Sequence, residues 1–266
     1  MSSSIPFTKL SATGNDFILI DNREKLLASD DVELFYRLCR RRTGIGADGV
    51  LLIEKNPEFH FTMRYFNADG RESSMCGNGA RATAFYAFQR GLAPSPMNFE
   101  VSGEPYHAVV QGNTVRLRMR KPIDLKLNLG ILDEREMTEG GFVNTGVPHY
   151  VLFVDDVDRV AVNEIGGKYR HHVFFSPAGT NVNFVKVHDA SRVFLRTYER
   201  GVEEETLACG TGTVATAIIA HLHKGTSFPL TVMTRGGKLI VHGDSSFDGL
   251  ELEGEVNEVF TGRLQA

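Results

Sequence analysis

The chain has 266 residues, of which 42% are hydrophobic and 23% are charged, and its formal net charge is −4. This composition supports a substantial buried core, and the small negative charge argues against nucleic acid or an anionic membrane as the main partner. The first residues, MSSSIPFTKL, lack the basic and apolar regions of a signal peptide. No apolar run reaches the roughly 18 residues of a membrane span. We therefore expect a cytoplasmic protein whose three cysteines stay reduced.

The first half of the chain reads as short β-branched runs separated by Gly, Asp and Asn turns, which predicts strands. A helix is expected at 31–41, where Phe35 and Leu38 lie on one side, and a longer helix at 78–91. Strands are expected at 4–10, 16–21, 49–54, 59–66, 98–102, 106–111 and 114–119.

The second half repeats this order around one long helix. That helix follows Cys209, runs to about His223 and stops at Gly225. Its sequence, TGTVATAIIAHL, is apolar on nearly every side, as is typical of a helix enclosed by a sheet. Strands are expected at 149–155, 182–187, 192–199, 229–234, 237–243 and 247–253.

One nine-residue phrase occurs twice in the chain. CGNGARATA begins at Cys76 and CGTGTVATA begins at Cys209, 133 residues later, and Tyr65 and Tyr198 keep the same spacing. Such self-similarity over half the length indicates an internal duplication. We expect an α/β (α+β) protein of two pseudosymmetric lobes, 1–120 and 121–255, each a mostly antiparallel sheet or barrel wrapped around a central helix.

Each repeated cysteine stands just before a glycine-rich turn that opens an apolar helix. Unpaired N–H groups and the helix dipole stabilise a thiolate there, and such cysteines have pKa values between about 3.5 and 7.5 instead of about 8.5. The glycines also leave the N–H groups open to a carboxylate. One thiolate that removes a proton and one thiol that donates a proton meet the requirement of a two-base stereoinversion.

Simpler interpretations exist for the same residues. Cys39, in an apolar helix, is best explained as a small buried side chain. Cys76 and Cys209 alone are also compatible with structural thiols or a regulatory disulfide. A phosphate loop is disfavoured, because neither Gly-Lys-Ser/Thr nor G-x-G-x-x-G is completed. Taken singly, His149 and Glu199 are ordinary polar residues at strand ends, and the asparagines are turn formers.

The chain resembles the diaminopimelate epimerases, cofactor-independent amino-acid epimerases of lysine and peptidoglycan biosynthesis, over essentially its whole length. The resemblance implies an active site in the cleft between the two lobes and a last strand, about 256–266, that returns to the first lobe. The segments that carry it are TGNDFILIDN (13–22), RTGIGADGVLL (42–52), YFNADGRESSMCGNGARA (65–82), TGVPHYVLFVDD (145–156), GTNVNFV (179–185) and YERGVEEETLACGTGTVA (198–215).

The resemblance also implies roles for individual residues. Cys76 and Cys209 are the two acid/base thiols, and His149 and Glu199 tune them. Many members have Asn where this chain has Val147, so one side-chain contact of the family pattern is missing here. A homodimer is expected, with no pyridoxal phosphate, metal or other cofactor. The implied substrate-binding residues are Asn15, Asn67, Gly77, Asn78, Asn181, Glu199, Arg200, Gly210 and Thr211.

The hypothesis is therefore the reversible conversion of LL-2,6-diaminoheptanedioate to the meso isomer. Glu199, Arg200 and the asparagines favour a substrate with a second amino-acid head. The alternatives are a proline racemase or 4-hydroxyproline epimerase, which shares the two thiols, and an isomerase of the phenazine-biosynthesis type, which lacks them. A binding protein without catalysis is a third alternative, which the intact thiol pair disfavours.

Overall fold

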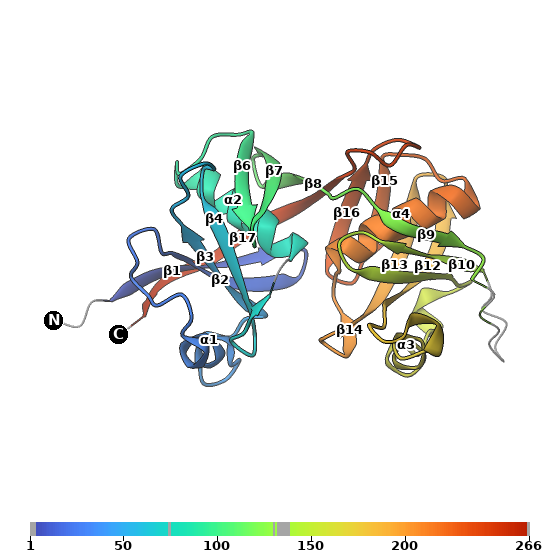
Figure 1. Ribbon diagram of the computed structural model, residues 1–266, viewed down its shortest axis with the longest axis horizontal. Coiled ribbons are helices and arrows are strands. Elements are labelled where there is room, and N and C mark those ends of the chain that lie inside the picture. The colour runs from blue at the N-terminus through green and yellow to red at the C-terminus, as the bar shows by residue number, and fades with distance from the viewer. Residues whose placement is uncertain (1–3, 74–75, 130, 132–138, 265–266) are drawn as a thin grey trace. The chain divides into compact units, whose positions relative to one another are not determined.

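The computed structural model describes residues 4–73, 76–129, 131 and 139–264. The chain divides into two compact units (Figure 1). Unit 1 comprises Met1–Leu117 and Gly254–Ala266, and unit 2 comprises Arg118–Glu253. Each unit is built from one long central helix, one short outer helix and a sheet of short strands.

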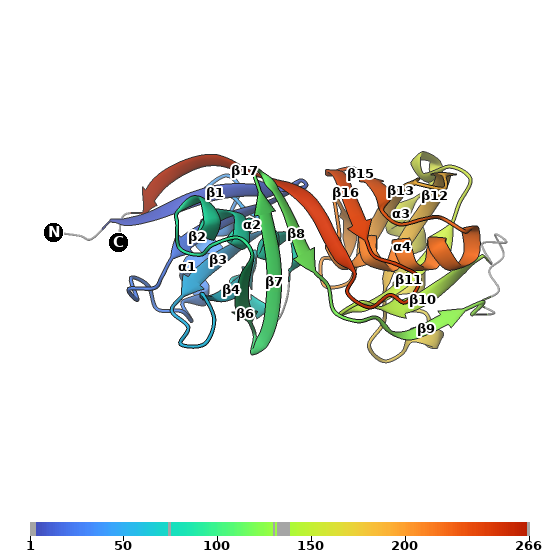
Figure 2. The ribbon, with the colours of Figure 1, turned by 90° about the horizontal axis from the view of Figure 1, so that it is seen from above.

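Unit 1 follows the predicted order of strands and helices. β1 and β2 pair antiparallel, β2 pairs parallel with β3, and β4 pairs parallel with β6. The last strand of the chain, β17, runs antiparallel beside β1, with Ile5 opposite Leu264 and Ala12 opposite Val256 (Figure 2). The elements are β1 Ile5–Ala12, β2 Asn15–Asp21, α1 Val32–Cys39, β3 Gly49–Glu54, β4 Thr62–Asn67, β5 Glu72–Ser73, α2 Gly77–Gln89, β6 Met97–Val101, β7 Glu104–Gln111, β8 Thr114–Arg118 and β17 Glu251–Leu264.

Unit 2 repeats the same scheme. Its parallel pairs, β11–β12 and β13–β15, stand where β2–β3 and β4–β6 stand in unit 1. The elements are β9 Ile123–Leu127, β10 Gly140–Asn144, β11 Pro148–Phe153, α3 Val162–Arg170, β12 Asn181–Asp189, β13 Arg192–Glu199, β14 Glu204–Thr206, α4 Gly210–Lys224, β15 Leu230–Thr234 and β16 Gly237–His242, with 3-10 turns at Val157–Arg159 and Val173–Phe175. The repeated pairing supports the duplication on which the fold prediction depends.

The central helices α2 and α4 are buried along almost their whole length. In α2 every residue from Gly77 to Phe85 is buried, and in α4 every residue from Gly212 to Ala220 is buried. Each packs against strands of its own unit, and α4 ends at Gly225, whose φ of 65° is the left-handed geometry that glycine adopts without strain. The predicted fold class, a sheet wrapped around a central helix in each half, is confirmed.

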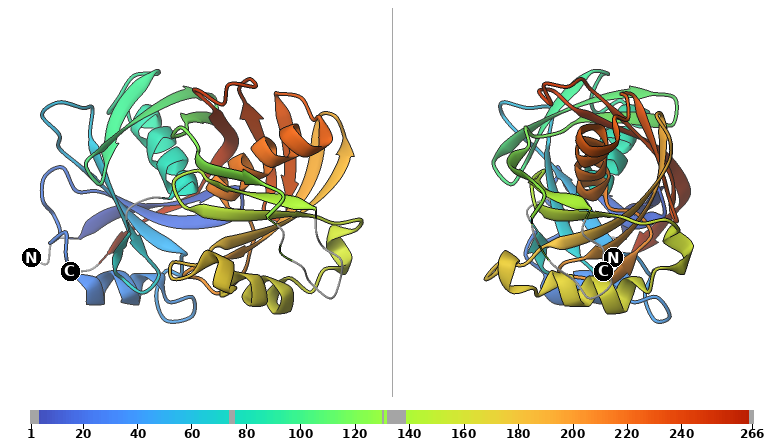
Figure 3. Two further views of the ribbon diagram at one scale, coloured as in Figure 1. Left: turned by 45° about the vertical axis from the view of Figure 1, so that its right-hand side comes forward. Right: turned by 90° about the vertical axis from the view of Figure 1, so that its right-hand side faces the viewer.

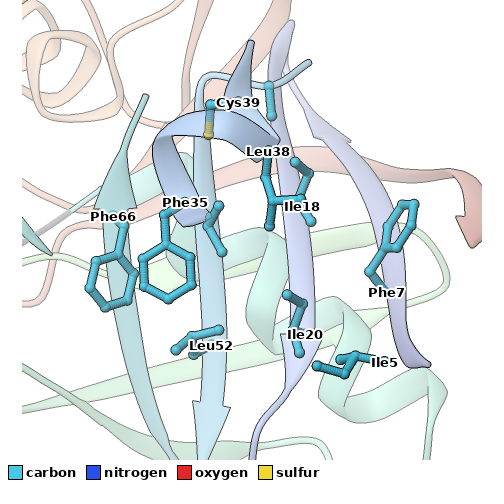
Figure 4. Close-up of a cluster of buried hydrophobic side chains, with 11 residues drawn as sticks. Ile5, Phe7, Ile18, Ile20, Phe35, Leu38, Cys39, Leu52 and Phe66 are labelled. Carbon is cyan, nitrogen blue, oxygen red and sulfur yellow. The ribbon is translucent and has the colours of Figure 1, made fainter. Parts of the chain in front are cut away.

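The outer helices α1 and α3 cover the other face of the sheet in each unit (Figure 3). In unit 1, Phe35 of α1 packs against Phe66 of β4 with ring centroids 4.4 Å apart and the rings tilted by 42°, within a cluster that includes Leu38 and Cys39 (Figure 4). Burial raises the pKa of the Cys39 thiol to about 12. Cys39 is thus the small buried side chain that the sequence indicated.

Several elements differ from the sequence prediction, which also did not include the short strands β5 and β14. The strand expected at 247–253 begins only at Glu251 and continues without a break into the strand expected from about 256, so that the two form one strand, β17. Strands β9 and β10 and helix α3 were not expected from the sequence. In α3, two adjacent glycines lower helix propensity, and an added Cβ at Gly166 would lie 2.4 Å from Tyr198 Cβ, so close packing explains a helix that composition disfavours.

Candidate functional site

The first repeated cysteine lies at the start of α2. Cys76 is the N-cap residue, with φ −143° and ψ 111°, and its Sγ accepts a hydrogen bond from the Gly79 N–H at 3.4 Å. Gly77 and Asn78 form the first turn and are buried. The predicted position of this thiol, at a helix N-terminus, is confirmed.

A chain of amide hydrogen bonds surrounds Cys76. Asn78 Nδ2 donates to Asn15 Oδ1 at 3.3 Å, and Asn15 Nδ2 donates to a carboxylate oxygen of Asp48. The Cys76 Sγ lies 3.8 Å from the same Asn15 Oδ1. On the other side, Arg81 Nη2 donates to Asn78 Oδ1 at 2.9 Å. The structure therefore brings Asn15, Asn78 and Cys76 together, and the substrate-binding roles that the resemblance implies for the two asparagines stay predictions.

Asn67 lies at the end of β4, opposite Gly49 of β3, and is exposed. Its backbone N–H donates to the Arg71 carbonyl at 2.9 Å and its carbonyl accepts from Gly70 at 2.9 Å, closing a turn. Among the described residues, no hydrogen bond joins its side chain to Asn15 or Asn78. Its predicted part in substrate binding stays a prediction.

The second repeated cysteine lies at the start of α4. Cys209 is the N-cap residue and is buried, and Gly210 begins the helix. Its Sγ lies 3.5 Å from the Thr211 hydroxyl oxygen. The Thr145 hydroxyl donates to the Thr211 carbonyl at 2.9 Å, which ties the turn before β11 to the first turn of the helix.

His149 reaches Cys209 through Thr211. His149 Nε2 lies 2.9 Å from Thr211 Oγ1, and His149 Nδ1 lies 3.1 Å from Asn183 Nδ2. An amide nitrogen only donates, so Nδ1 accepts and Nε2 carries the hydrogen that is donated to Thr211. The Thr211 hydroxyl is then left to donate to the Cys209 sulfur. His149, which was expected to tune a thiol, thus reaches the Cys209 sulfur through the Thr211 hydroxyl that lies between them.

The imidazole of His149 is neutral. Its complete burial, aided by the positive charge of Arg200, lowers the pKa of His149 to about 3. Desolvation disfavours the charged form of a histidine, and the nearby cation Arg200 acts in the same direction. His149 therefore orients the Thr211 hydroxyl as a neutral donor.

Asn183 is a residue of this arrangement that the sequence prediction missed. Asn183 fixes the tautomer of His149, and it is itself held by the Tyr150 carbonyl at 3.1 Å and the Thr197 hydroxyl at 3.0 Å. At Gly212, an added Cβ would lie 2.5 Å from Asn183 Oδ1 and 3.3 Å from His149 Cε1. An asparagine inside the buried run of β12 is the sequence signal that could have pointed to Asn183.

Asn181, Glu199 and Arg200 lie at neighbouring strand ends of unit 2. The Asn181 side chain donates to the Pro148 carbonyl at 2.8 Å and accepts from the Arg200 backbone N–H at 2.8 Å. Glu199 accepts from the Thr206 hydroxyl at 2.9 Å, and Arg200 Nη1 donates to the Ala178 carbonyl at 3.2 Å. The Asn181 side chain thus holds backbone groups of Pro148 and Arg200 in place. Glu199 and Arg200 lie next to it, at the end of β13.

Two other features are absent from the part of the chain that the structure describes. No group of three His, Cys, Asp or Glu side chains is placed to hold a metal ion among them. Within the same residues, no helix has the length and apolar character to cross a membrane.

Comparisons with known proteins point to one family. A family model described as diaminopimelate epimerase matches residues 7–122 and 141–257. The chain is 41% identical over 273 residues to the diaminopimelate epimerase of Hydrogenobaculum sp. and, over the same length, 41% identical to that of Aquifex aeolicus, with 97% of each chain covered.

Solved structures show the same fold at low sequence identity. A phenazine biosynthesis protein of the PhzF family from Bacillus anthracis superposes with a TM-score of 0.76 at 15% identity, covering 99% of this chain and 100% of that chain. A hydroxyproline epimerase from Agrobacterium vitis, with bound trans-4-hydroxy-L-proline, gives a TM-score of 0.69 at 13% identity, covering 99% and 94%. These two likenesses establish the fold and nothing about the substrate.

Proposed function

Because the chain belongs to the diaminopimelate epimerase family and is therefore an amino-acid epimerase, we propose that it interconverts LL- and meso-2,6-diaminoheptanedioate with Cys76 and Cys209 as the acid/base pair. One observation carries this proposal: two duplicated, buried helices each begin at a cysteine. A proline racemase or 4-hydroxyproline epimerase is the weaker alternative, since the full-length relatives named above are diaminopimelate epimerases.

The proposed step is a proton exchange at the α-carbon. The thiolate of one cysteine takes the α-proton from one face, and the thiol of the other cysteine gives its proton to the opposite face. The carbon inverts, and one thiolate and one thiol remain, so that the proton count balances. Donors at the sulfurs, Gly79 N–H for Cys76 and the Thr211 hydroxyl for Cys209, favour the ionised form of each.

The negative charge that develops on the substrate requires donors. We assign the carboxylate at the reacting carbon to the first-turn N–H groups of α2 and α4, at Gly77-Asn78 and Gly210-Thr211, because helix N-termini bind anions. Such fixed donors stabilise a carbanion-like transition state without having to reorganise.

The non-reacting end of the substrate is assigned to the polar residues around the two helices. The Arg200 guanidinium suits a carboxylate and the Glu199 carboxylate suits an ammonium group. Asn181 positions the Arg200 backbone, and neutral Asn side chains supply both donors and acceptors. The asparagines assigned to this end are Asn15, Asn67, Asn78 and Asn181.

We further propose that the protein works in the cytoplasm as a homodimer and uses no cofactor. Three free cysteines, Cys39, Cys76 and Cys209, fit a reducing compartment. The proposed chemistry uses only side chains and helix N-termini of the chain. Sedimentation of the purified protein tests the dimer, which a monomer at micromolar concentration would rule out.

Proton exchange in D2O tests the function directly. Reduced protein and LL-diaminopimelate should show loss of the α-proton NMR signal together with formation of the meso isomer. Cys76→Ala and Cys209→Ala should each abolish epimerisation, while Cys39→Ala, the matched control, should retain it. Exchange with proline or trans-4-hydroxy-L-proline and none with diaminopimelate would establish the alternative instead.

A further inference from the structure

Arg81 is a fully buried arginine in the first half of α2, with an exposed fraction of 0%. Its Nη2 donates to Asn78 Oδ1 at 2.9 Å and to Thr13 Oγ1 at 3.0 Å. Across the described residues, its Nε and Nη1 have no hydrogen-bond partner. Burying a guanidinium with unpaired donors is costly, so a functional reason for its presence is expected.

Packing does not require an arginine at this place in the helix. The repeat places Val214 of α4 at the position equivalent to Arg81, and Val214 is likewise 0% exposed. A neutral apolar side chain therefore satisfies the same helix position in unit 2. The positive charge is specific to the helix that begins at Cys76.

The charge of Arg81 is not neutralised by the ionic groups near Asn15. Those groups pair with one another: Lys9 with Asp16 at 2.7 Å, Arg41 with Asp16 at 3.0 Å, and Arg41 with Asp48 at 2.6 Å. Two cations and two anions cancel, so this cluster contributes no net charge. Burial lowers the pKa of Arg81 to about 10, and the nearby Cys76 acts in the opposite direction and raises it. At pH 7 the guanidinium is therefore charged.

The donors of Arg81 also fix the direction of the neighbouring amides. Since a guanidinium only donates, Asn78 turns Oδ1 towards Arg81 and Nδ2 towards Asn15. Asn15 then receives this hydrogen at Oδ1 and directs Nδ2 to Asp48. One buried cation thus orders both amides that lie beside the Cys76 sulfur.

Among the described residues, Asn15 acts on the ionisation of Cys76 in the opposite sense to Arg81 and the Gly79 N–H, and the sizes of these effects differ. Asn15 Oδ1, 3.8 Å from the sulfur, favours the protonated thiol, but S–H is a weak donor and this distance is long. A buried full charge acts more strongly than this contact. The Gly79 N–H donates to the Cys76 sulfur and, like the charge of Arg81, favours the thiolate.

We propose that Arg81 is a positioning residue for the thiol of unit 1, which orders Asn78 and Asn15 and favours the ionised form of Cys76 by its unneutralised charge. The proposal rests on the acid/base function proposed for Cys76. It adds a residue whose action passes through others, because the side chain of Arg81 donates hydrogen bonds to Asn78 and Thr13.

The test is alkylation of individual cysteines by iodoacetamide between pH 5 and 10, quantified by peptide mass spectrometry on the full chain. The midpoint is the pH at which the alkylation rate of a cysteine reaches half of its maximum. Arg81→Met should raise this midpoint for Cys76 by about one pH unit, as loss of a nearby opposite charge does. Arg81→Lys should restore it, and the Cys209 midpoint should not move. The matched control is Arg90→Met, an arginine at the exposed end of the same helix that pairs with Glu258 at 2.7 Å. It should leave both midpoints unchanged.

Arg81→Gln separates the charge from the hydrogen bonds and serves if the methionine variant does not fold. Its amide can still donate to Asn78, so the Cys76 midpoint should rise while KM stays near that of the parent protein and the rate optimum moves to higher pH. An unchanged Cys76 midpoint in a folded Arg81→Gln or Arg81→Met protein would overturn the proposal, as would an equal shift at Cys209. Alkylation does not depend on turnover. A wild-type protein without diaminopimelate exchange would therefore refute the proposed function and leave this measurement intact.

Discussion

His149 and Asn183 form a buried pair in which the amide nitrogen lies 3.1 Å from the imidazole Nδ1. The amide also donates to the Tyr150 carbonyl, which excludes the flipped orientation that would set two oxygens against each other. Asn183 therefore selects the tautomer that donates from Nε2 to Thr211. The Asn183 amide thus determines that the Thr211 hydroxyl is free to donate its hydrogen to the Cys209 sulfur.

Asn183→Asp should weaken catalysis by reversing this tautomer. A carboxylate at position 183 accepts from Nδ1–H, so Nε2 becomes an acceptor for the Thr211 hydroxyl, which then turns away from the Cys209 sulfur. Loss of one hydrogen bond to a charged group is worth about 1.5–3 kcal/mol, or about a 10- to 100-fold fall in kcat. Steady-state epimerisation measures it.

The matched control for this change is Asn98→Asp. Asn98 also bonds a histidine ring nitrogen, that of His107 at 2.9 Å, but on an exposed hairpin of unit 1. It should leave kcat within about twofold of the parent value. Equal losses in both variants would show that the His149 tautomer does not matter.

His149 should make the protein less stable in mild acid. Its pKa is lowered to about 3 by burial, against 6.5 for the ordinary side chain. Between these values the unfolded state binds a proton that the folded state does not, so stability is complete above about pH 6.5. It falls as pH falls, by up to about 1.4 kcal/mol per pH unit.

Urea unfolding at pH 7 and pH 4.5 measures this dependence. His149→Asn should lose less stability between the two pH values than the parent protein loses. His188→Asn, which removes a histidine whose side chain is 53% exposed, should leave the difference as it is. The assignment to His149 fails if all three proteins lose the same amount.

Alanine at the two equivalent helix glycines should have unequal effects. An added Cβ at Gly212 meets the hydrogen-bonded Asn183 oxygen at 2.5 Å, whereas at Gly79 the nearest atom is the Leu51 Cδ2 at 3.1 Å. The end of a leucine side chain can shift, but the Asn183 amide is held by three partners. We expect Gly212→Ala to cost about 1–3 kcal/mol through overpacking and Gly79→Ala clearly less, since alanine also raises helix propensity. Thermal unfolding compares them, and a larger loss for Gly79→Ala would contradict the geometry.

Cys39 should be chemically silent. With its pKa raised to about 12, only about one Cys39 thiol in 10,000 is ionised at pH 8. Alkylation of the native protein at that pH should label Cys76 and Cys209 and spare Cys39, and unfolding in urea should expose all three. Cys39→Ala should cost about 1 kcal/mol of stability by leaving a small cavity. Rapid labelling of Cys39 in the native protein would contradict its burial.

Some elements could not be predicted from the sequence, for identifiable reasons. In β9 all five residues are exposed, so its alternating pattern has no buried face to mark it as a strand. In β10 two of the five residues are glycines, which have low strand propensity, and in α3 Gly166 and Gly167 interrupt the helical pattern. These elements form because neighbouring strands and Tyr198 supply pairing and packing that local composition does not reveal.

The sequence by itself determined the duplication, the two helices that begin at Cys76 and Cys209, and the stop at Gly225, because glycine turns and apolar periodicity are local signals. Tertiary structure decided which side chains support the thiols. His149 meets Thr211 62 positions away and Asn183 34 positions away, and Asn15 meets Asp48 33 positions away. Such contacts depend on strand register and on the direction of each buried donor, which are set only when the strands have paired around the helix.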